Sequence, residues 1–212
     1  MCSETIAIFK DIIISSAAFV GTYVAVKGLG IWRKQLIGHA EYDLSRRLLV
    51  SLYKYRDVIN GVRHPVIWGH EMPHPPKDKE ETMTREQIRF YGTSEAYRTR
   101  WDKVQTERTS LYADLLEAEA LWGVELNDLF KAIFNLQHEL LTNVRHHLEL
   151  IDPDTDESKK ESIRGIRKKK REVMYDELSY DENEDEDEYK KEFKEAAKNI
   201  EGYLKPKLIV NR

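Results

Sequence analysis

Residues 31–63 read IWRKQLIGHAEYDLSRRLLVSLYKYRDVINGVR, a stretch of 33 residues without proline. Apolar side chains recur in it at steps of three and four, the spacing of one helix face. They are Trp32, Leu36, Ala40, Leu44, Leu48, Leu52, Tyr55, Ile59 and Val62. Basic side chains such as Arg46 and Arg47 fall on the remaining surface. The pattern predicts a long amphipathic helix whose apolar stripe packs against other helices.

The residues before this helix are strongly apolar. Residues 12–26 form a run of 15 without a charge. Continued to Trp32, the run has 21 residues, which is about 31 Å of helix at about 1.5 Å per residue. That length matches the roughly 30 Å hydrocarbon core of a bilayer. We therefore expect residues 12–32 to be a transmembrane helix that runs on into a juxtamembrane helix over residues 33–63, with Gly28, Gly30 and Gly38 as places where it could bend.

Basic residues near the two ends of the span orient it. Lys10 alone precedes the charge-free run, whereas Lys27, Arg33 and Lys34 follow it. Because basic residues collect on the cytoplasmic side of a membrane, the bulk of the chain is expected to face the cytoplasm. Two alternatives stay open. One is a soluble bundle whose N-terminal helix is buried, and the other is a cleavable signal peptide, although the chain has neither a basic start nor a convincing cleavage site.

Residues 26–63, VKGLGIWRKQLIGHAEYDLSRRLLVSLYKYRDVINGVR, resemble a group of uncharacterised bacterial membrane proteins with one N-terminal span. In that group the span runs into a Trp-Arg-Lys-x-Leu segment, here residues 32–36, and then into an amphipathic helix with paired arginines. The resemblance lies within the first third of the chain and brings no catalytic residue. It implies a place in the bacterial inner membrane.

Residues 64–83, HPVIWGHEMPHPPKDKEETM, hold four of the six prolines, so the long helix has to end before them. A helical pattern resumes at Thr84, which stands with Gln87 in the positions of a capping box, and it continues to Ile151. A single helix over residues 84–151 would be about 100 Å long, too long to fold against the first helix alone. Residues 122–124, Trp-Gly-Val, are either a hairpin turn or a kink. We expect an antiparallel helical bundle or coiled coil, with a core that includes Trp101, Trp122, Phe130 and Phe134.

Residues 152–188 carry blocks of opposite charge. Residues 164–171 include six basic side chains in eight, and residues 181–188 include seven acidic ones in eight. Such blocks usually remain solvated, which predicts a flexible segment. A final helix and tail are expected over residues 189–212. The predicted organisation is all-α, with boundaries at 1–11, 12–32, 33–63, 64–83, 84–151, 152–188 and 189–212.

The chain lacks the sequence motifs of common enzymes: it has no glycine-rich phosphate loop, no Gly-x-Ser-x-Gly elbow and no HExxH pair. Two groups of residues that include histidines are candidate metal-binding sites. The first is His64, His70 and His74 with Glu71, and the second is His138, Glu139, His146, His147 and Glu149. The first group is loosely spaced for a metal site. The second shares a helix face in part, but a di-iron site would need Glu-x-x-His pairs on facing helices, and the one such pair, Glu71 and His74, lies in the Pro-rich stretch. We predict no catalytic, cofactor or metal site, and we keep an oligomeric enzyme or effector with a histidine-bound metal as an alternative.

The charge distribution suggests the partners. Residues 31–63 carry seven basic and three acidic side chains, although the whole chain has a net charge of −4. Positive charge beside a span favours anionic lipid. The acidic run that follows the basic run 167–171 argues against nucleic acid. We expect a membrane-anchored interaction or regulatory protein that binds a partner protein or a second copy and is not an enzyme, while the process it serves and its oligomeric state stay undetermined.

Overall fold

The computed structural model describes the backbone of residues 2–175 and 187–209, and it describes side chains from residue 16 onward, residue 18 excepted. These residues form helices and no strand, which confirms the all-α prediction. The long helices are α1 (Cys2–Arg63), α3 (Arg85–Trp122), α4 (Glu125–Ile151) and α6 (Glu188–Leu204). The short ones are η1 (Gly69–Glu71), α2 (Lys77–Glu80), α5 (Glu157–Arg167) and η2 (Lys205–Leu208).

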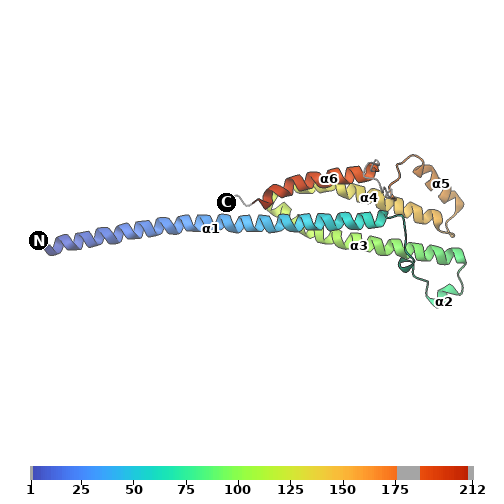
Figure 1. Ribbon diagram of the computed structural model, residues 1–212, viewed down its shortest axis with the longest axis horizontal. Coiled ribbons are helices and arrows are strands. Elements are labelled where there is room, and N and C mark those ends of the chain that lie inside the picture. The colour runs from blue at the N-terminus through green and yellow to red at the C-terminus, as the bar shows by residue number, and fades with distance from the viewer. Residues whose placement is uncertain (1, 176–186, 210–212) are drawn as a thin grey trace.

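Four helices form an up-down-up-down bundle (Figure 1). The second half of α1 packs against α3 on one side and against α6 on the other, and α4 closes the ring by contacting both α3 and α6. Helices that follow one another along this ring run antiparallel (Figure 1). This is the expected antiparallel arrangement, and η2 returns the end of the chain to the middle of α1.

The apolar stripe of α1 is buried only where the other helices reach it. From Leu44 to Val62 its members are almost completely inaccessible, whereas Trp32 and Leu36 are 61% and 56% exposed. The predicted aromatic core residues also differ among themselves. Phe130 is fully buried, while Trp101, Trp122 and Phe134 are half-buried against the edge of the core.

A hairpin at Gly123 separates α3 from α4. Gly123 has a φ of 81°, in the left-handed region that favours glycine, and its amide donates to Glu119 O at 2.9 Å. The predicted capping box begins α3, since Gln87 N donates to Thr84 Oγ1 at 3.2 Å and Thr84 N donates to Gln87 Oε1 at 2.9 Å. Residues 84–151 are therefore two helices and not one.

The prediction of a solvated segment over residues 152–188 is corrected by the structure for the part that it describes. Residues 157–167 form α5, which begins where Asp156 Oδ2 accepts from Ser158 N at 2.9 Å. Ile163, Val173 and Met174 are buried. These few apolar side chains dock the segment on the bundle. The composition did not predict this docking, because most of the residues around them are charged. Residues 176–186 lie outside the described residues.

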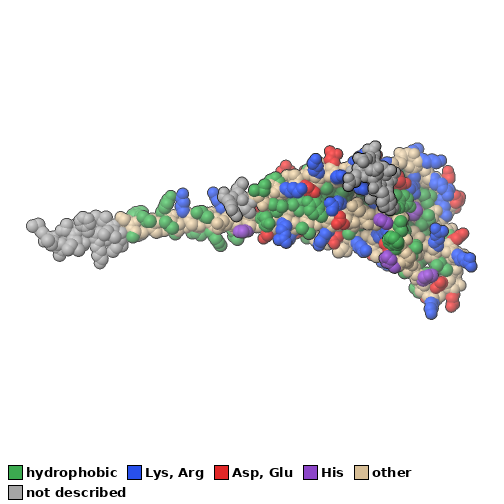
Figure 2. Space-filling model, viewed as in Figure 1, with side chains coloured by type: hydrophobic (Ala, Val, Ile, Leu, Met, Phe, Trp, Pro, Cys, Tyr) green, Lys and Arg blue, Asp and Glu red, His purple; other side chains and the backbone are tan. Residues whose placement is uncertain are grey.

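The first half of α1 extends away from the bundle as an arm (Figures 1 and 2). Along residues 19–37 its large apolar side chains are more than half exposed, so the arm is not an N-terminal helix buried in its own bundle. In the part of the chain that the structure describes, no helix is both long enough and apolar enough to cross a membrane. The side chains of residues 12–15 and 18 of the predicted span lie outside that part.

Candidate functional site

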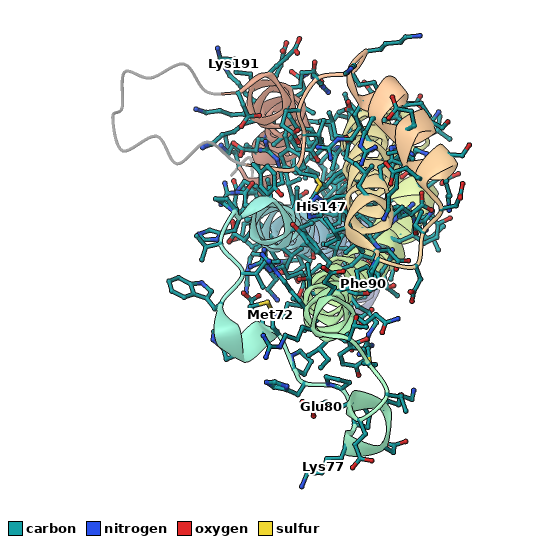
Figure 3. All side chains as sticks on the ribbon, turned by 90° about the vertical axis from the view of Figure 1, so that its right-hand side faces the viewer. Met72, Lys77, Glu80, Phe90, His147 and Lys191 are labelled. Carbon is teal, nitrogen blue, oxygen red and sulfur yellow. The ribbon has the colours of Figure 1, made fainter. Side chains whose placement is uncertain are left out.

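A candidate site lies at the end of the bundle farthest from the arm, which we call the distal end. It consists of the Pro-rich loop 64–84, the start of α3, the end of α4 and α5. Figure 3 looks onto it, with α2, which carries Lys77 and Glu80, projecting away from the bundle.

Arg100 holds the first half of the loop against α3. Its side chain is 7% exposed, and its guanidinium donates to both carboxylate oxygens of Glu71 at 2.8 Å. Nη1 also donates to His64 O at 2.9 Å, and Nη2 donates to Val66 O at 2.7 Å. A guanidinium has five N–H donors and so can make these four bonds at once, whereas a lysine ammonium has only three donors. Arg100 thus holds the loop at three residues, Glu71, His64 and Val66.

Glu71 in turn fixes η1. Its Oε2 accepts from Trp68 N at 2.9 Å, so one carboxylate ties Arg100 to the backbone of the loop. The bond from Arg100 is the main cause that lowers the pKa of Glu71 to about 2, despite partial burial. The next residue, Met72, lies close to α3 at Gly92, where an added Cβ would come within 3.2 Å of Met72 Cβ. The loop surface is therefore preformed.

A cleft of about 720 Å³ opens between this loop and the helices. That volume is within the range of small-molecule and peptide-side-chain pockets. Figure 3 labels Met72 from the loop, Phe90 from α3 and His147 from α4, which all contribute to it. The full lining is Pro65, Ile67, Met72, Glu86, Arg89, Phe90, Thr93, His147, Ile151, Pro153 and Lys160. Six of these eleven residues are apolar, and the other five include charges of both signs.

His147 contributes a half-buried imidazole to the wall of the cleft. Burial is the main cause that lowers its pKa, and the positive charge of Arg167 adds to it. The ring lies edge-on to Tyr97, with centroids 5.9 Å apart, and to Tyr175 at 6.3 Å. A neutral imidazole supplies one hydrogen-bond donor and one acceptor to the wall of the cleft, which suits recognition of a polar group.

The other side of the loop presents a second hollow of about 540 Å³. Trp68, which is 57% exposed, lines this hollow, and the nearby Val66 of the same loop is 41% exposed. Exposed aromatic and apolar side chains on a rigid loop are typical of protein-binding surfaces. The loop therefore offers apolar groups on both of its faces.

The histidines of the sequence hypothesis do not assemble into a metal site. His64 Nδ1 lies 3.1 Å from Val66 O, and His74 Nδ1 lies 3.5 Å from Glu80 Oε1. His138 is exposed, and Glu139 binds Arg171 at 2.7 Å. Within residues 16–175 and 187–209, no three histidine, cysteine or acidic side chains come together as metal ligands would. The described residues give the metal alternative no support.

Sequence reasoning missed the two buried arginines, Arg63 and Arg100. A signal for Arg100 does exist, because it lies between Tyr97 and Val104 on the apolar stripe of α3 and so occupies a core position. Arg63 likewise follows Val62 and Ile59 at the end of the α1 stripe. A basic residue in core register indicates a buried partner elsewhere in the chain.

Comparisons with protein-family models, with curated proteins and with solved structures give no significant match for this chain.

Proposed function

We propose that this protein is a membrane-anchored helical bundle that binds a partner protein at its distal end. The observation that carries the anchoring part is the exposure of the arm. Between Phe19 and Ile37, ten large apolar side chains are each more than half exposed. They are Phe19, Val20, Tyr23, Val24, Val26, Leu29, Ile31, Trp32, Leu36 and Ile37.

The apolar residues of the arm support a bilayer as the environment of this helix. At about 100° per residue their positions are distributed around the whole helix and do not form one stripe. A single partner helix would cover one stripe only, whereas lipid covers every side. Residues 12–15, Ile-Ile-Ile-Ser, extend the apolar sequence toward the N-terminus. Trp32, Arg33 and Lys34 then stand where interfacial and headgroup contacts are favourable.

This placement puts the distal end well away from the membrane. Arg63 follows Trp32 by 31 positions in one unbroken helix, which is about 46 Å at about 1.5 Å per residue. In the proposed orientation the bundle lies on the cytoplasmic side of a bacterial inner membrane, and its preformed cleft faces away from the lipid. Binding, and not catalysis, is supported by the mixture of apolar and charged side chains in the preformed cleft.

Vesicle flotation tests the anchor. In the arm variant Val20→Lys/Val24→Lys, each lysine would cost about 2.5–3.5 kcal/mol at the centre of a span. The matched control, Val50→Lys/Leu116→Lys, adds the same charge at bundle positions that are 45% and 52% exposed. We expect the wild type and the control to float with neutral and anionic vesicles while the arm variant sinks. Equal flotation of all three, with unchanged helical circular dichroism, would reject the anchor.

Crosslinking in cells tests the distal cleft. Met72→Glu/Phe90→Glu places two charges in its apolar wall, and Leu121→Glu/Leu116→Glu places them on exposed positions elsewhere. A partner bound in the cleft should lose its crosslink to the first variant and keep it with the second. A crosslinking pattern that is the same for both variants would show that the cleft binds no partner.

A further inference from the structure

The end of the bundle from which the arm leaves, which we call the proximal end, carries exposed apolar side chains that the distal site does not use. Figure 1 shows the turn between α3 and α4 at this end, beside α1. Leu121 and Val124 flank the turn and are 52% and 60% exposed. On α1, Leu36 and Ile37 are also more than half exposed. None of these four side chains belongs to the core, so all four are open to a partner.

Contacts from three other elements hold the turn beside α1. Trp122 Nε1 donates to Glu41 Oε1 at 3.2 Å, and the Trp122 ring lies edge-on to Tyr203 of α6 with centroids 6.3 Å apart. The ammonium of Lys207, in η2, lies 4.4 Å from the centre of the Trp122 ring. The turn is thereby fixed near the level of Glu41. Tryptophan, tyrosine and lysine are also residue types that suit the boundary between a bilayer and water.

The turn lies close to the place where the proposed anchor leaves the lipid. Trp32 stands at the membrane interface in that proposal, and Glu41 follows it by nine positions, which is about 14 Å of helix. The headgroup layer covers about 5–8 Å of this distance. The gap that remains is less than about 10 Å, and a helix tilt of about 20°, which is ordinary in membranes, narrows it on one side. This step rests on the proposed function.

Lipid fits this end better than a protein does. A partner protein would have to enter the gap between the turn and the headgroups, and even a single helix is about 10–12 Å across. Lipid already surrounds the arm and needs no such room. The nearby carboxylates of Glu117 and Glu119 bind Arg47 and Asn127 within the bundle. Glu125, next to the turn, disfavours anionic headgroups, so the contact suits neutral lipid.

We infer that the proximal end of the bundle rests on the bilayer that holds the arm, with Leu121 and Val124 in the headgroup layer and Trp122 beside them at the interface. The contact is apolar and does not require anionic lipid. It adds a second point of attachment to the arm, and two points restrict the tilt of the bundle. The distal cleft is therefore held at a constant distance from the membrane.

Lipid-borne quenchers test this contact in the full-length protein. A polarity-sensitive fluorophore is attached beside the turn in Cys2→Ser/Glu125→Cys and at an exposed position of α3 in Cys2→Ser/Gln105→Cys. Position 105 is 17 residues before Trp122, about 25 Å farther along the bundle. Both proteins are reconstituted in phosphatidylcholine vesicles with a nitroxide on the headgroup. We expect the fluorophore at position 125 to lose intensity and the one at position 105 to keep it.

Two kinds of failure are distinguishable in this experiment. Equal intensities at the two positions, in vesicles that retain the protein, would overturn the contact and leave the anchor intact. Loss of the protein from the vesicles would reject the anchor and the contact together. Protection of the fluorophore at position 125 from aqueous iodide, without quenching by the nitroxide lipid, would assign this end to a second copy of the chain and would also overturn the proposal.

Protein variants locate the contact. Leu121→Asn/Val124→Asn should reduce the quenching at position 125, because removing two apolar side chains weakens contact with lipid by about tenfold or more. The matched control Tyr112→Asn/Leu116→Asn removes exposed apolar side chains from α3 farther from the arm, and it should leave the quenching unchanged. Equal quenching in both variants would contradict the role of the turn. An increase in quenching when anionic lipid is added would replace the proposed apolar contact by an electrostatic one.

Discussion

Arg100 and Glu71 form a two-bonded ion pair, with Nε and Nη2 of the arginine each 2.8 Å from a carboxylate oxygen. The pair joins the middle of α3 to the loop between α1 and α3, 29 positions earlier in the chain. Together with the packing of Met72 on Gly92, the pair fixes the loop that forms one wall of the cleft.

Replacing this guanidinium should destabilise the protein strongly. Arg100→Met leaves the Glu71 carboxylate and two carbonyl groups without their donor, at a cost of about 3–5 kcal/mol in the free energy of unfolding. Arg98→Met removes an exposed arginine that pairs with Glu95 and Asp102 on the same helix, and it should cost less than about 1 kcal/mol. Urea denaturation measures both values. Similar losses in the two variants would contradict the structural role given to Arg100.

The same pair predicts a dependence on pH. The pKa of Glu71 is about 2 in the folded protein, below its ordinary 4.5, so its ionised form is stabilised by folding. Its contribution, on the order of 3 kcal/mol, is present above about pH 4.5 and is lost as the pH falls toward 2. The difference in unfolding free energy between the wild type and Glu71→Gln should shrink over that interval. The difference for Glu81→Gln should stay near zero, and a constant difference for Glu71→Gln would contradict the low pKa.

Replacing Gly123 in the hairpin and Gly61 in α1 by alanine should have opposite effects on the free energy of unfolding. Gly123→Ala forces a φ of 81° on a residue with a Cβ, which should lower the free energy of unfolding by about 1 kcal/mol. Gly61→Ala replaces a helical glycine that has open space around it, and it should raise that free energy by about 0.5–1 kcal/mol. Thermal or urea denaturation distinguishes the two. If both variants were more stable than the wild type, Gly123 would not have the positive φ on which the turn depends.

Cys2 is the only cysteine in the chain and reports the orientation of the arm. In spheroplasts that express the full-length protein, the proposed orientation places Cys2 outside the cytoplasm. A membrane-impermeant maleimide should therefore label it without detergent. In Cys2→Ser/Gln105→Cys the new thiol lies on an exposed position of α3, and it should be labelled only after detergent is added. The reverse pattern would invert the proposed orientation.

Several features could be predicted because they depend on neighbours in the sequence. The capping box of Thr84 and Gln87 involves residues three positions apart, and the structure contains both of its hydrogen bonds. The buried stripe from Leu44 to Val62 follows helical spacing alone. The choice between hairpin and kink at Gly123 could not be made in advance, because glycine permits either conformation and the packing of α4 against α3 decides between them.

The docking of residues 157–175 escaped prediction for a different reason. Charged side chains dominate this segment, and composition therefore indicated that it is solvated. Its contacts are made by a few residues to distant partners: Val173 is buried, and its carbonyl accepts from Arg63, 110 positions earlier. Arg171 likewise reaches Glu139 and Glu192 on two different helices. No local pattern marks such pairs.

The sequence by itself determined that this protein is helical, where its amphipathic stripes lie and that its N-terminal region is apolar, because each of these follows from residues within a few positions of one another. Only the tertiary structure decided which faces meet, and hence which arginines lose contact with water. Burying a guanidinium is unfavourable unless remote acceptors surround it. For Arg63 and Arg100 those acceptors are supplied by Asp187, Val173 and Glu71. Arg100 holds the loop that forms one wall of the cleft, so the cleft depends on contacts between segments that are far apart in the chain.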